Sequence, residues 1–198
     1  MSERAEMADK TPEQSGKKNQ QKEVLTMGQE LYQTLQSLVS IVLVIIFLFT
    51  FVVRITVVDG ESMENTLHHG DIVLTWTLGY TPKQGDVVVL TKETFREQSI
   101  IKRVIATEGQ TVDIDYATST VYVDGVALDE PYIKEFMNPL WGENIDHVTV
   151  PEGHIFVMGD NRNNSSDSRL PSIGVVDERC VIGHGVMVLF PFADFGML

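Results

Sequence analysis

The chain has 198 residues, of which 43% are hydrophobic, and a formal net charge of −13. This length is sufficient for a membrane anchor and one domain with its own core. The negative charge argues against nucleic acid as a partner, because binding phosphates requires a basic surface. Cys180 is the only cysteine, which excludes a disulfide framework and a cysteine-based zinc site.

The N-terminal part divides into a polar segment and an apolar segment. Residues 1–30 are rich in Glu, Lys, Gln and Ser near their start, and we predict that they form a disordered cytoplasmic tail. Residues 31–53 carry no charge, and as a helix they would span roughly 34 Å, against about 30 Å for the hydrocarbon core of a bilayer. No small-residue cleavage site follows, as a secretory signal peptide would require. We therefore predict a retained transmembrane helix at 31–53, the alternative being a buried core helix.

The basic residues on either side of this helix predict its orientation. Lys17, Lys18 and Lys22 precede it, whereas only Arg54 lies close to its other end. The excess of Lys before the helix favours a cytoplasmic N-terminus. Residues 186–192 are apolar but too short to span, and we see no second candidate. The predicted location is the cell membrane, with one span and residues 54–198 outside the cytoplasm.

After the anchor the pattern changes to short β-branched runs separated by turn residues. No amphipathic helix pattern of 12 residues follows the anchor. We predict a mainly β fold, in which the N-terminal transmembrane helix precedes a compact, barrel-like or sandwich-like domain. Surface loops are expected at 95–99, 130–142 and 161–171. The predicted strands are residues 71–75, 86–90, 100–106, 111–115, 120–123, 148–150, 155–158 and 181–190.

Ser62 lies in the sequence Gly-Glu-Ser-Met-Glu-Asn-Thr-Leu, shortly after the apolar run. A serine in such a loop is ordinarily a turn or capping residue. Its position nevertheless puts its hydroxyl close to the point where the chain leaves the membrane. Whether it is a nucleophile depends on a suitable base elsewhere in the chain.

Lys102 is the candidate base. In a strand over residues 100–106, alternation puts Lys102 on the same face as Ile100, Val104 and Ala106. If that face is buried, desolvation lowers the lysine pKa, and a neutral lysine can take a proton from a serine hydroxyl. The alternative is a lysine on an edge strand whose amine reaches water.

The third stretch is Gly-Asp-Asn-Arg-Asn-Asn-Ser-Ser-Asp-Ser-Arg at residues 159–169. A calcium-binding loop is excluded because Arg162 stands where an oxygen ligand is needed. The alternatives are a solvated loop and a hydrogen-bonded wall beside a reactive group. In the second case Asp167 and Arg169 would form a charge-assisted pair, and Ser165 could hold Lys102 in place.

In this order, the three stretches resemble the type I signal peptidases, the membrane-bound serine proteases that remove signal peptides from exported proteins. The Gly-Asp-Ile-Val and Gly-Asp-Val-Val sequences at 70–73 and 85–88 also fit, and the resemblance covers the anchor and nearly all of residues 55–192. Family members without the lysine carry a histidine there, so Lys102 indicates the bacterial type.

The resemblance implies a role for each site residue. Ser62 would be the nucleophile, and its backbone N–H would stabilise the oxyanion. Lys102 would be the general base, in a dyad that uses no histidine, metal or cofactor. Ser165 would lie near the lysine, Asp167 and Arg169 would form a structural pair, and Met63 would line the substrate-binding region. The substrates would be preprotein signal peptides with small residues, typically Ala, one and three positions before the cut.

The sequence departs from the family pattern at two positions. Asn65 stands where the family usually has Pro, which leaves the rigidity of the loop after Ser62 open. Gly60 stands where some members have a serine that donates to the oxyanion, so the Ser62 N–H would carry more of that task.

Two other functions are alternatives to this one. One is a self-cleaving serine–lysine protease of the repressor type, which often cuts at Ala-Gly or Cys-Gly; neither dipeptide occurs here. The other is a membrane-anchored β-domain that binds a partner and catalyses nothing. The five histidines show no ligand spacing, and we assign them no metal: His68, His69, His147, His154 and His184.

Overall fold

The computed structural model describes residues 12–91 and 99–198. The chain divides into two compact units, Met1–Leu48 and Phe49–Leu198. Helix α1 (Pro12–Phe47) makes up the described part of the first unit and continues into the π-helical turn η1 (Leu48–Val52). The segment Met27–Val52 has a mean hydropathy of 2.7 and is long and apolar enough to cross a membrane, and its apolar side chains are not buried against protein.

The helix begins earlier than predicted. Residues 1–11 of the expected disordered tail lie outside the described residues, whereas residues 12–30 belong to helix α1. Gln, Glu and Lys are good helix formers. Once the apolar segment is helical, each added residue gains a hydrogen bond without a new nucleation cost. The polar segment therefore extends the helix although it lacks apolar periodicity.

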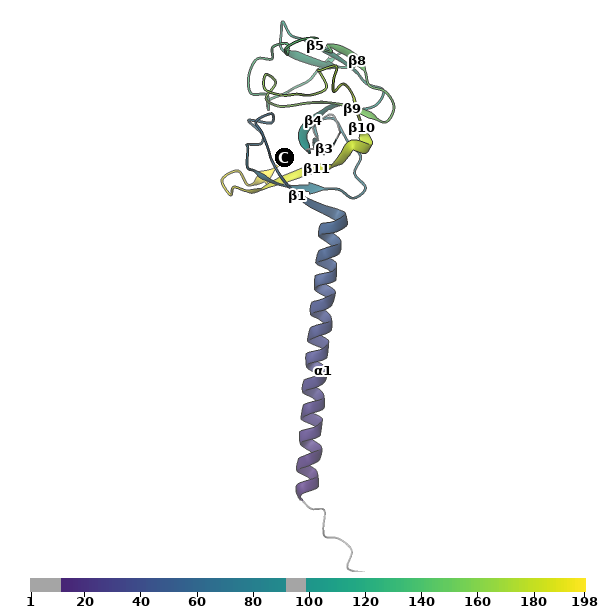
Figure 1. Ribbon diagram of the computed structural model, residues 1–198, viewed down its shortest axis with the longest axis vertical. Coiled ribbons are helices and arrows are strands. Elements are labelled where there is room, and N and C mark those ends of the chain that lie inside the picture. The colour runs from purple at the N-terminus through teal and green to yellow at the C-terminus, as the bar shows by residue number, and fades with distance from the viewer. Residues whose placement is uncertain (1–11, 92–98) are drawn as a thin grey trace, which may run out of the picture. The chain divides into compact units, whose positions relative to one another are not determined.

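The second unit is built from short antiparallel strands in two sheets (Figure 1). The larger sheet has the order β1-β2-β11-β3-β4-β9-β10, with β12 added beside β11, and the smaller has the order β7-β6-β5-β8. The strands are β1 (Val53–Val57), β2 (Ile72–Trp76), β3 (Val87–Leu90), β4 (Ile100–Ala106), β5 (Thr111–Asp115), β6 (Thr120–Val123), β7 (Val126–Ala127), β8 (His147–Thr149), β9 (His154–Met158), β10 (Val176–Asp177), β11 (Val181–Phe190) and β12 (Gly196–Met197).

The larger sheet is buried on both faces at its centre. On β3, Val87 and Val89 pack into one apolar cluster, whereas Val88 and Leu90 pack into another. This two-sided burial explains why β3 is a continuous apolar run without alternation. A third cluster joins residues of β4 and β9 to the smaller sheet; its members include Ile105, Val112, Val121, Phe156 and Met158.

The mainly β fold class is confirmed. After η1, the described residues contain no helix longer than the 3-10 turn η3 (Glu178–Cys180). Each predicted strand is present, within a residue or so at its ends, whereas β1, β7, β10 and β12 were not predicted. β7, β10 and β12 are only two residues long. β1 begins at Val53, a residue that the sequence analysis assigns to the membrane helix. The loop expected at 95–99 lies almost entirely outside the described residues.

Candidate active site

The loop that carries Ser62 connects β1 to β2 and is fixed by its own backbone. The Met63 carbonyl accepts hydrogen bonds from the N–H groups of Thr66 (3.0 Å) and Leu67 (2.8 Å). Leu67 is fully buried and anchors the end of the turn in the core. Ser62 itself is half-buried, so its hydroxyl stays accessible on a rigid turn.

A second loop, after β9, holds the peptide groups on either side of Ser62. The Asn161 N–H donates to the Ser62 carbonyl at 3.0 Å, and Asn161 Nδ2 donates to the Glu61 carbonyl at 3.0 Å. Gly159 lies so close that a Cβ there would be 2.5 Å from the Ser62 carbonyl oxygen. The sequence analysis identifies the polar loop that contains Asn161 but gives Asn161 no role of its own.

Lys102 projects from β4 toward this turn. Its strand lies between β3 and β9, so it is not an edge strand. Lys102 is 3% exposed, and Ile100 and Val104, on the same face, pack in one apolar cluster. Lys102 Nζ donates to Ser62 Oγ at 2.6 Å and to the Ile101 carbonyl at 3.1 Å. The amine is thus removed from bulk water and directed at the hydroxyl.

Burial lowers the pKa of Lys102 to about 8, from an ordinary value of 10.5. Removal from water disfavours the charged ammonium and is the largest cause. The carboxylates of Asp167 and Asp160 oppose the shift, because negative charge favours the ammonium, while Arg169 adds to the lowering. A useful fraction of the amine is therefore neutral at physiological pH.

Asp167 and Arg169 form a fully buried, bidentate ion pair. Arg169 Nε lies 2.8 Å from Asp167 Oδ1, and Nη2 lies 2.9 Å from Oδ2. Burial alone would raise the pKa of Asp167, but hydrogen bonds and charge from Arg169, together with the Gly159 N–H, lower it. The pair also reaches the polar loop itself, since Arg169 Nη2 donates to the Arg162 carbonyl at 2.6 Å.

Ser165 is brought to the site but makes no hydrogen bond to Lys102. Its Oγ is buried and has no hydrogen-bond partner of good geometry among the described residues. The hydroxyl lies near Asp167 and contributes to the lowering of that pKa. A Cβ on Gly159 would lie 2.3 Å from this oxygen, so the absence of a side chain at 159 leaves the space that Ser165 occupies.

Met63 is placed differently from the expectation. Its side chain is 1% exposed and packs with Val58, Leu67 and Ile101 in the core. It is not among the residues that line the cavity beside Ser62. The structure thus gives Met63 a packing role under the turn, and its contact with substrate stays a prediction.

Two further buried ion pairs hold the site, and neither was predicted as a pair. Arg103 binds Asp160 in bidentate fashion, with Nε–Oδ1 at 2.9 Å and Nη2–Oδ2 at 2.7 Å, and Thr66 donates to the same carboxylate. Arg162 binds Glu130 through both of its terminal nitrogens. The first pair ties β4 to the Ser62 turn. The only signal in the sequence is the presence of charged residues in the strand and in the polar loop. The sequence does not show which acidic residue pairs with which basic residue.

The backbone explains the departure at Asn65. Its φ is +80°, in the left-handed region that Asn tolerates better than most residues. The proline ring fixes φ near −65°, so a proline could not occupy this backbone conformation. Asn65 Nδ2 also donates to the Ile133 carbonyl at 3.3 Å. The turn after Ser62 is therefore held by a left-handed residue rather than by a proline ring.

Ser62 and Lys102 open onto a cavity of about 970 Å³. Its remaining lining includes both polar and apolar residues, and consists of Asp59, Gly60, Glu61, His69, Ile100, Asn164, Ser166, Leu170, Ser172 and Ile173. A second cavity of about 290 Å³ shares Asn164, Ser166 and Leu170 with it. The two together form an extended depression that can take a stretch of peptide chain.

Comparisons with known proteins cover most of the chain. The family model described as signal peptidase, peptidase S26, matches residues 31–190. A probable signal peptidase I-1 of Synechocystis sp. is 37% identical over 171 residues, covering 81% of this chain and 83% of that protein. The signal peptidase I of Bacillus licheniformis is 32% identical over 173 residues, covering 83% of this chain and 91% of that protein. A crystal structure of a signal peptidase I from Enterococcus faecalis is 31% identical and covers 53% of this chain and 97% of that chain, with a TM-score of 0.44.

Proposed function

Since the chain belongs to the signal peptidase family, peptidase S26, we propose that Ser62 is its nucleophile and Lys102 its general base. The chain is a type I signal peptidase, a serine peptidase that acts on the signal peptides of preproteins. The observation that best supports the dyad is the 2.6 Å distance between Lys102 Nζ and Ser62 Oγ, on a lysine that is only 3% exposed.

In the proposed reaction, neutral Lys102 takes the Ser62 proton as Ser62 Oγ attacks the scissile carbonyl. The tetrahedral intermediate then collapses, and the lysine ammonium gives its proton to the leaving amine. Water next attacks the acyl-enzyme, with Lys102 again accepting a proton. As the second tetrahedral intermediate collapses, the bond to Ser62 Oγ breaks, the carboxyl product leaves, and Lys102 returns the proton to Ser62 Oγ. The turn and the polar loop keep both groups in place, so little reorganisation is needed during the reaction.

The oxyanion would be bound by the Ser62 backbone N–H. Among the described residues this N–H has no hydrogen-bond partner and is thus available. Gly60 has no hydroxyl to offer, and its own N–H donates to His69 Nδ1 at 3.2 Å. A single backbone donor would then carry the main share of oxyanion stabilisation.

The remaining site residues would position the dyad rather than react. The bidentate Asp167–Arg169 pair fixes the loop against β9, because Asp167 Oδ2 also accepts the Gly159 N–H at 3.0 Å. Ser165 lies in that loop with a buried, unpartnered hydroxyl, which would be available to a group that moves during the catalytic cycle. These contacts support a fixed wall beside the amine.

Cleavage specificity would come from the shape of the cavity. Ile100, Leu170 and Ile173 supply apolar lining next to Ser62. An apolar lining of this kind suits apolar side chains, in agreement with Ala at the positions one and three before the cut. The depression formed by the two cavities supports an extended substrate.

The apolar helix would anchor the enzyme in the cell membrane. Met27–Val52 has the length and hydropathy of a span, and Lys17, Lys18 and Lys22 before it, against Arg54 after it, favour a cytoplasmic N-terminus. Protease protection of an N-terminal epitope in sealed inverted and right-side-out vesicles tests this orientation. Anchoring raises the effective concentration of enzyme and membrane-bound substrate without adding contacts.

Neighbouring strands of the catalytic unit also support contact with the lipid bilayer. Large apolar side chains are exposed on β1, β2, β11 and β12 and on the turn before β12. Exposed apolar surface of this kind is typical of membrane or protein contact. The residues are Ile55, Val57, Trp76, Phe190, Phe192, Phe195 and Met197.

The dyad is tested with Ser62→Ala and Lys102→Met in the full chain. We expect both variants to lose cleavage of an Ala-x-Ala preprotein and Ser62→Ala to lose labelling by a serine-acylating β-lactam-like inhibitor. Lys83→Met is the matched control, because Lys83 is exposed and does not line the cavity beside Ser62. Circular dichroism checks folding. Full cleavage by either dyad variant would show that the assignment is wrong.

A further inference from the structure

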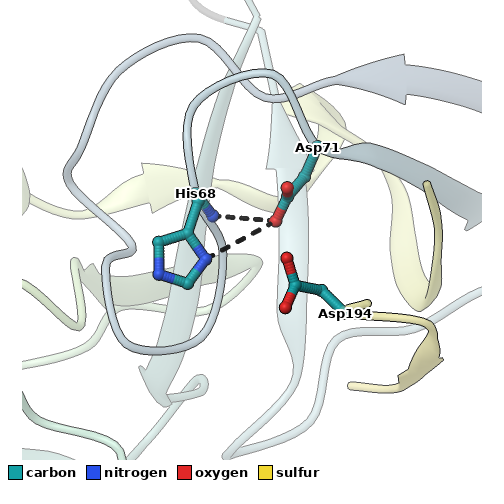
Figure 2. Close-up of side chains that lie close together, drawn as sticks. All are labelled: His68, Asp71 and Asp194. Atoms are coloured by element: carbon teal, nitrogen blue, oxygen red, sulfur yellow. Dashed lines mark hydrogen bonds and ion pairs between the residues drawn. The ribbon is translucent and has the colours of Figure 1, made fainter. Parts of the chain in front are cut away.

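A cluster of possible metal ligands lies outside the catalytic cavity (Figure 2). His68 and Asp71 belong to the loop that enters β2, and Asp194 to the turn between β11 and β12. One ligand atom from each lies within 4.8 Å of the others. The spacing of the histidines along the sequence gave no sign of this group, because Asp194 reaches it only through the fold.

Asp71 is the unusual member of the cluster. Its side chain is 3% exposed, and one carboxylate oxygen accepts the His68 N–H at 2.8 Å. The other oxygen has no hydrogen-bond partner among the described residues. The His68 imidazole nitrogen lies 4.0 Å from the carboxylate, beyond hydrogen-bond distance. Asp71 therefore has one carboxylate oxygen held by the His68 N–H and a second oxygen that is free to bind a ligand.

Asp194 adds a second negative charge rather than a compensating one. In Figure 2 its carboxylate is directed at that of Asp71. In the described part of the chain, no lysine or arginine forms an ion pair with either group. Two carboxylates so placed repel each other unless a cation lies between them.

We propose that His68, Asp71 and Asp194 bind one divalent transition-metal ion, with zinc the best match. A neutral imidazole and two carboxylates are ordinary zinc ligands, at about 2.0–2.2 Å from the metal. Imidazole makes calcium and magnesium poorer matches, because both prefer oxygen ligands alone. Tetrahedral ligands at such distances lie about 3.4 Å apart, so the exposed His68 and Asp194 side chains would close in on the buried Asp71.

The ion would join two parts of the chain that are far apart in sequence. On one side is the segment that continues from the Ser62 turn into β2. On the other is the C-terminal hairpin, where Met187 pairs with Met197 and the Leu198 N–H donates to the Val186 carbonyl at 3.0 Å. The metal would act as a structural cross-link and would take no part in peptide hydrolysis. Its presence or absence is therefore independent of the Ser62–Lys102 dyad.

The test uses the full chain in detergent, without a histidine tag and stripped with EDTA. Titration with ZnCl₂ in a calorimeter should show saturable binding of one ion, and Co²⁺ should give visible absorption bands from a site with nitrogen and oxygen ligands. His68→Gln and Asp194→Asn should each weaken zinc binding at least tenfold. Both residues are exposed, so the variants should fold, and retained peptide cleavage verifies this.

His147→Gln is the matched control. His147 also lies beside a carboxylate, with Nδ1 2.5 Å from Asp113 Oδ1, but this pair is not part of a three-ligand group. The zinc affinity of His147→Gln should equal that of the unmodified chain. Zinc should raise the melting temperature of these two proteins but not that of Asp194→Asn. The proposal is overturned if binding is not saturable, if Asp194→Asn binds zinc undiminished, or if His147→Gln loses as much affinity as His68→Gln.

Discussion

The pH dependence of cleavage is the sharpest consequence of the buried lysine. A lysine with a pKa of about 8 is neutral in roughly one molecule in ten at pH 7, whereas an ordinary value of 10.5 would leave about one in 3,000 neutral. Burial therefore increases the reactive fraction about 300-fold at that pH. Because the base must be neutral to accept the Ser62 proton, kcat/KM should rise about tenfold per pH unit below pH 8 and level off above it.

The measurement is the initial rate of cleavage of an internally quenched peptide with Ala one and three positions before the cut. The full chain is assayed in detergent between pH 6 and pH 11, under conditions where kcat/KM is obtained directly. Circular dichroism at each pH identifies the range in which the protein stays folded. Lys83→Met should show the same profile, because Lys83 is exposed and does not line the cavity that contains the dyad.

A rise in kcat/KM that continues to about pH 10.5 would refute the argument, since it would mean that Lys102 titrates like a lysine in water. A flat profile across pH 8 would also refute it, because the rate would then not depend on neutral lysine. Either result would contradict the chain of reasoning from burial to lowered pKa to base catalysis.

Three other predictions follow from single positions. Lys102→Met should raise the free energy of unfolding by up to about 3 kcal/mol at pH 7, because burying a charged lysine destabilises the folded state. This destabilisation is complete below about pH 8 and disappears as the pH rises toward 10.5. Urea unfolding at pH 7 and pH 10.5 measures the stability gained by the variant, and an equal gain at both pH values would contradict the prediction. Asn65→Pro should destabilise the protein by more than about 1 kcal/mol and reduce cleavage, whereas Asn65→Gly should retain both, because only glycine among the two accepts a φ of +80°. Gly159→Ala should reduce peptide cleavage at least tenfold, because its Cβ would lie 2.3 Å from Ser165 Oγ, while Gly196→Ala, with no atom nearer than 3.9 Å, should cleave at the normal rate.

The sequence alone determined those features that depend on local composition and period. An uncharged run from 31 to 53 predicts a spanning helix, and short β-branched runs between turn residues predict a mainly β domain; the second of these is confirmed. The period of two in a strand put Lys102 on the face of Ile100 and Val104, whose side chains share one apolar cluster. The motif around Ser62 and the polar loop sufficed to indicate the family, which the comparisons confirm.

Only the tertiary structure decided which side chains meet. A strand pattern gives two faces, but the burial of Lys102 depends on β3 and β9 lying on either side of β4. Likewise, the charges of Arg103 and Asp160 were visible in the sequence, yet their pairing requires the loop after β9 to fold back over that strand. Burial, ion pairing and the left-handed backbone at Asn65 are set by contacts between distant segments, and composition and period carry no information about them.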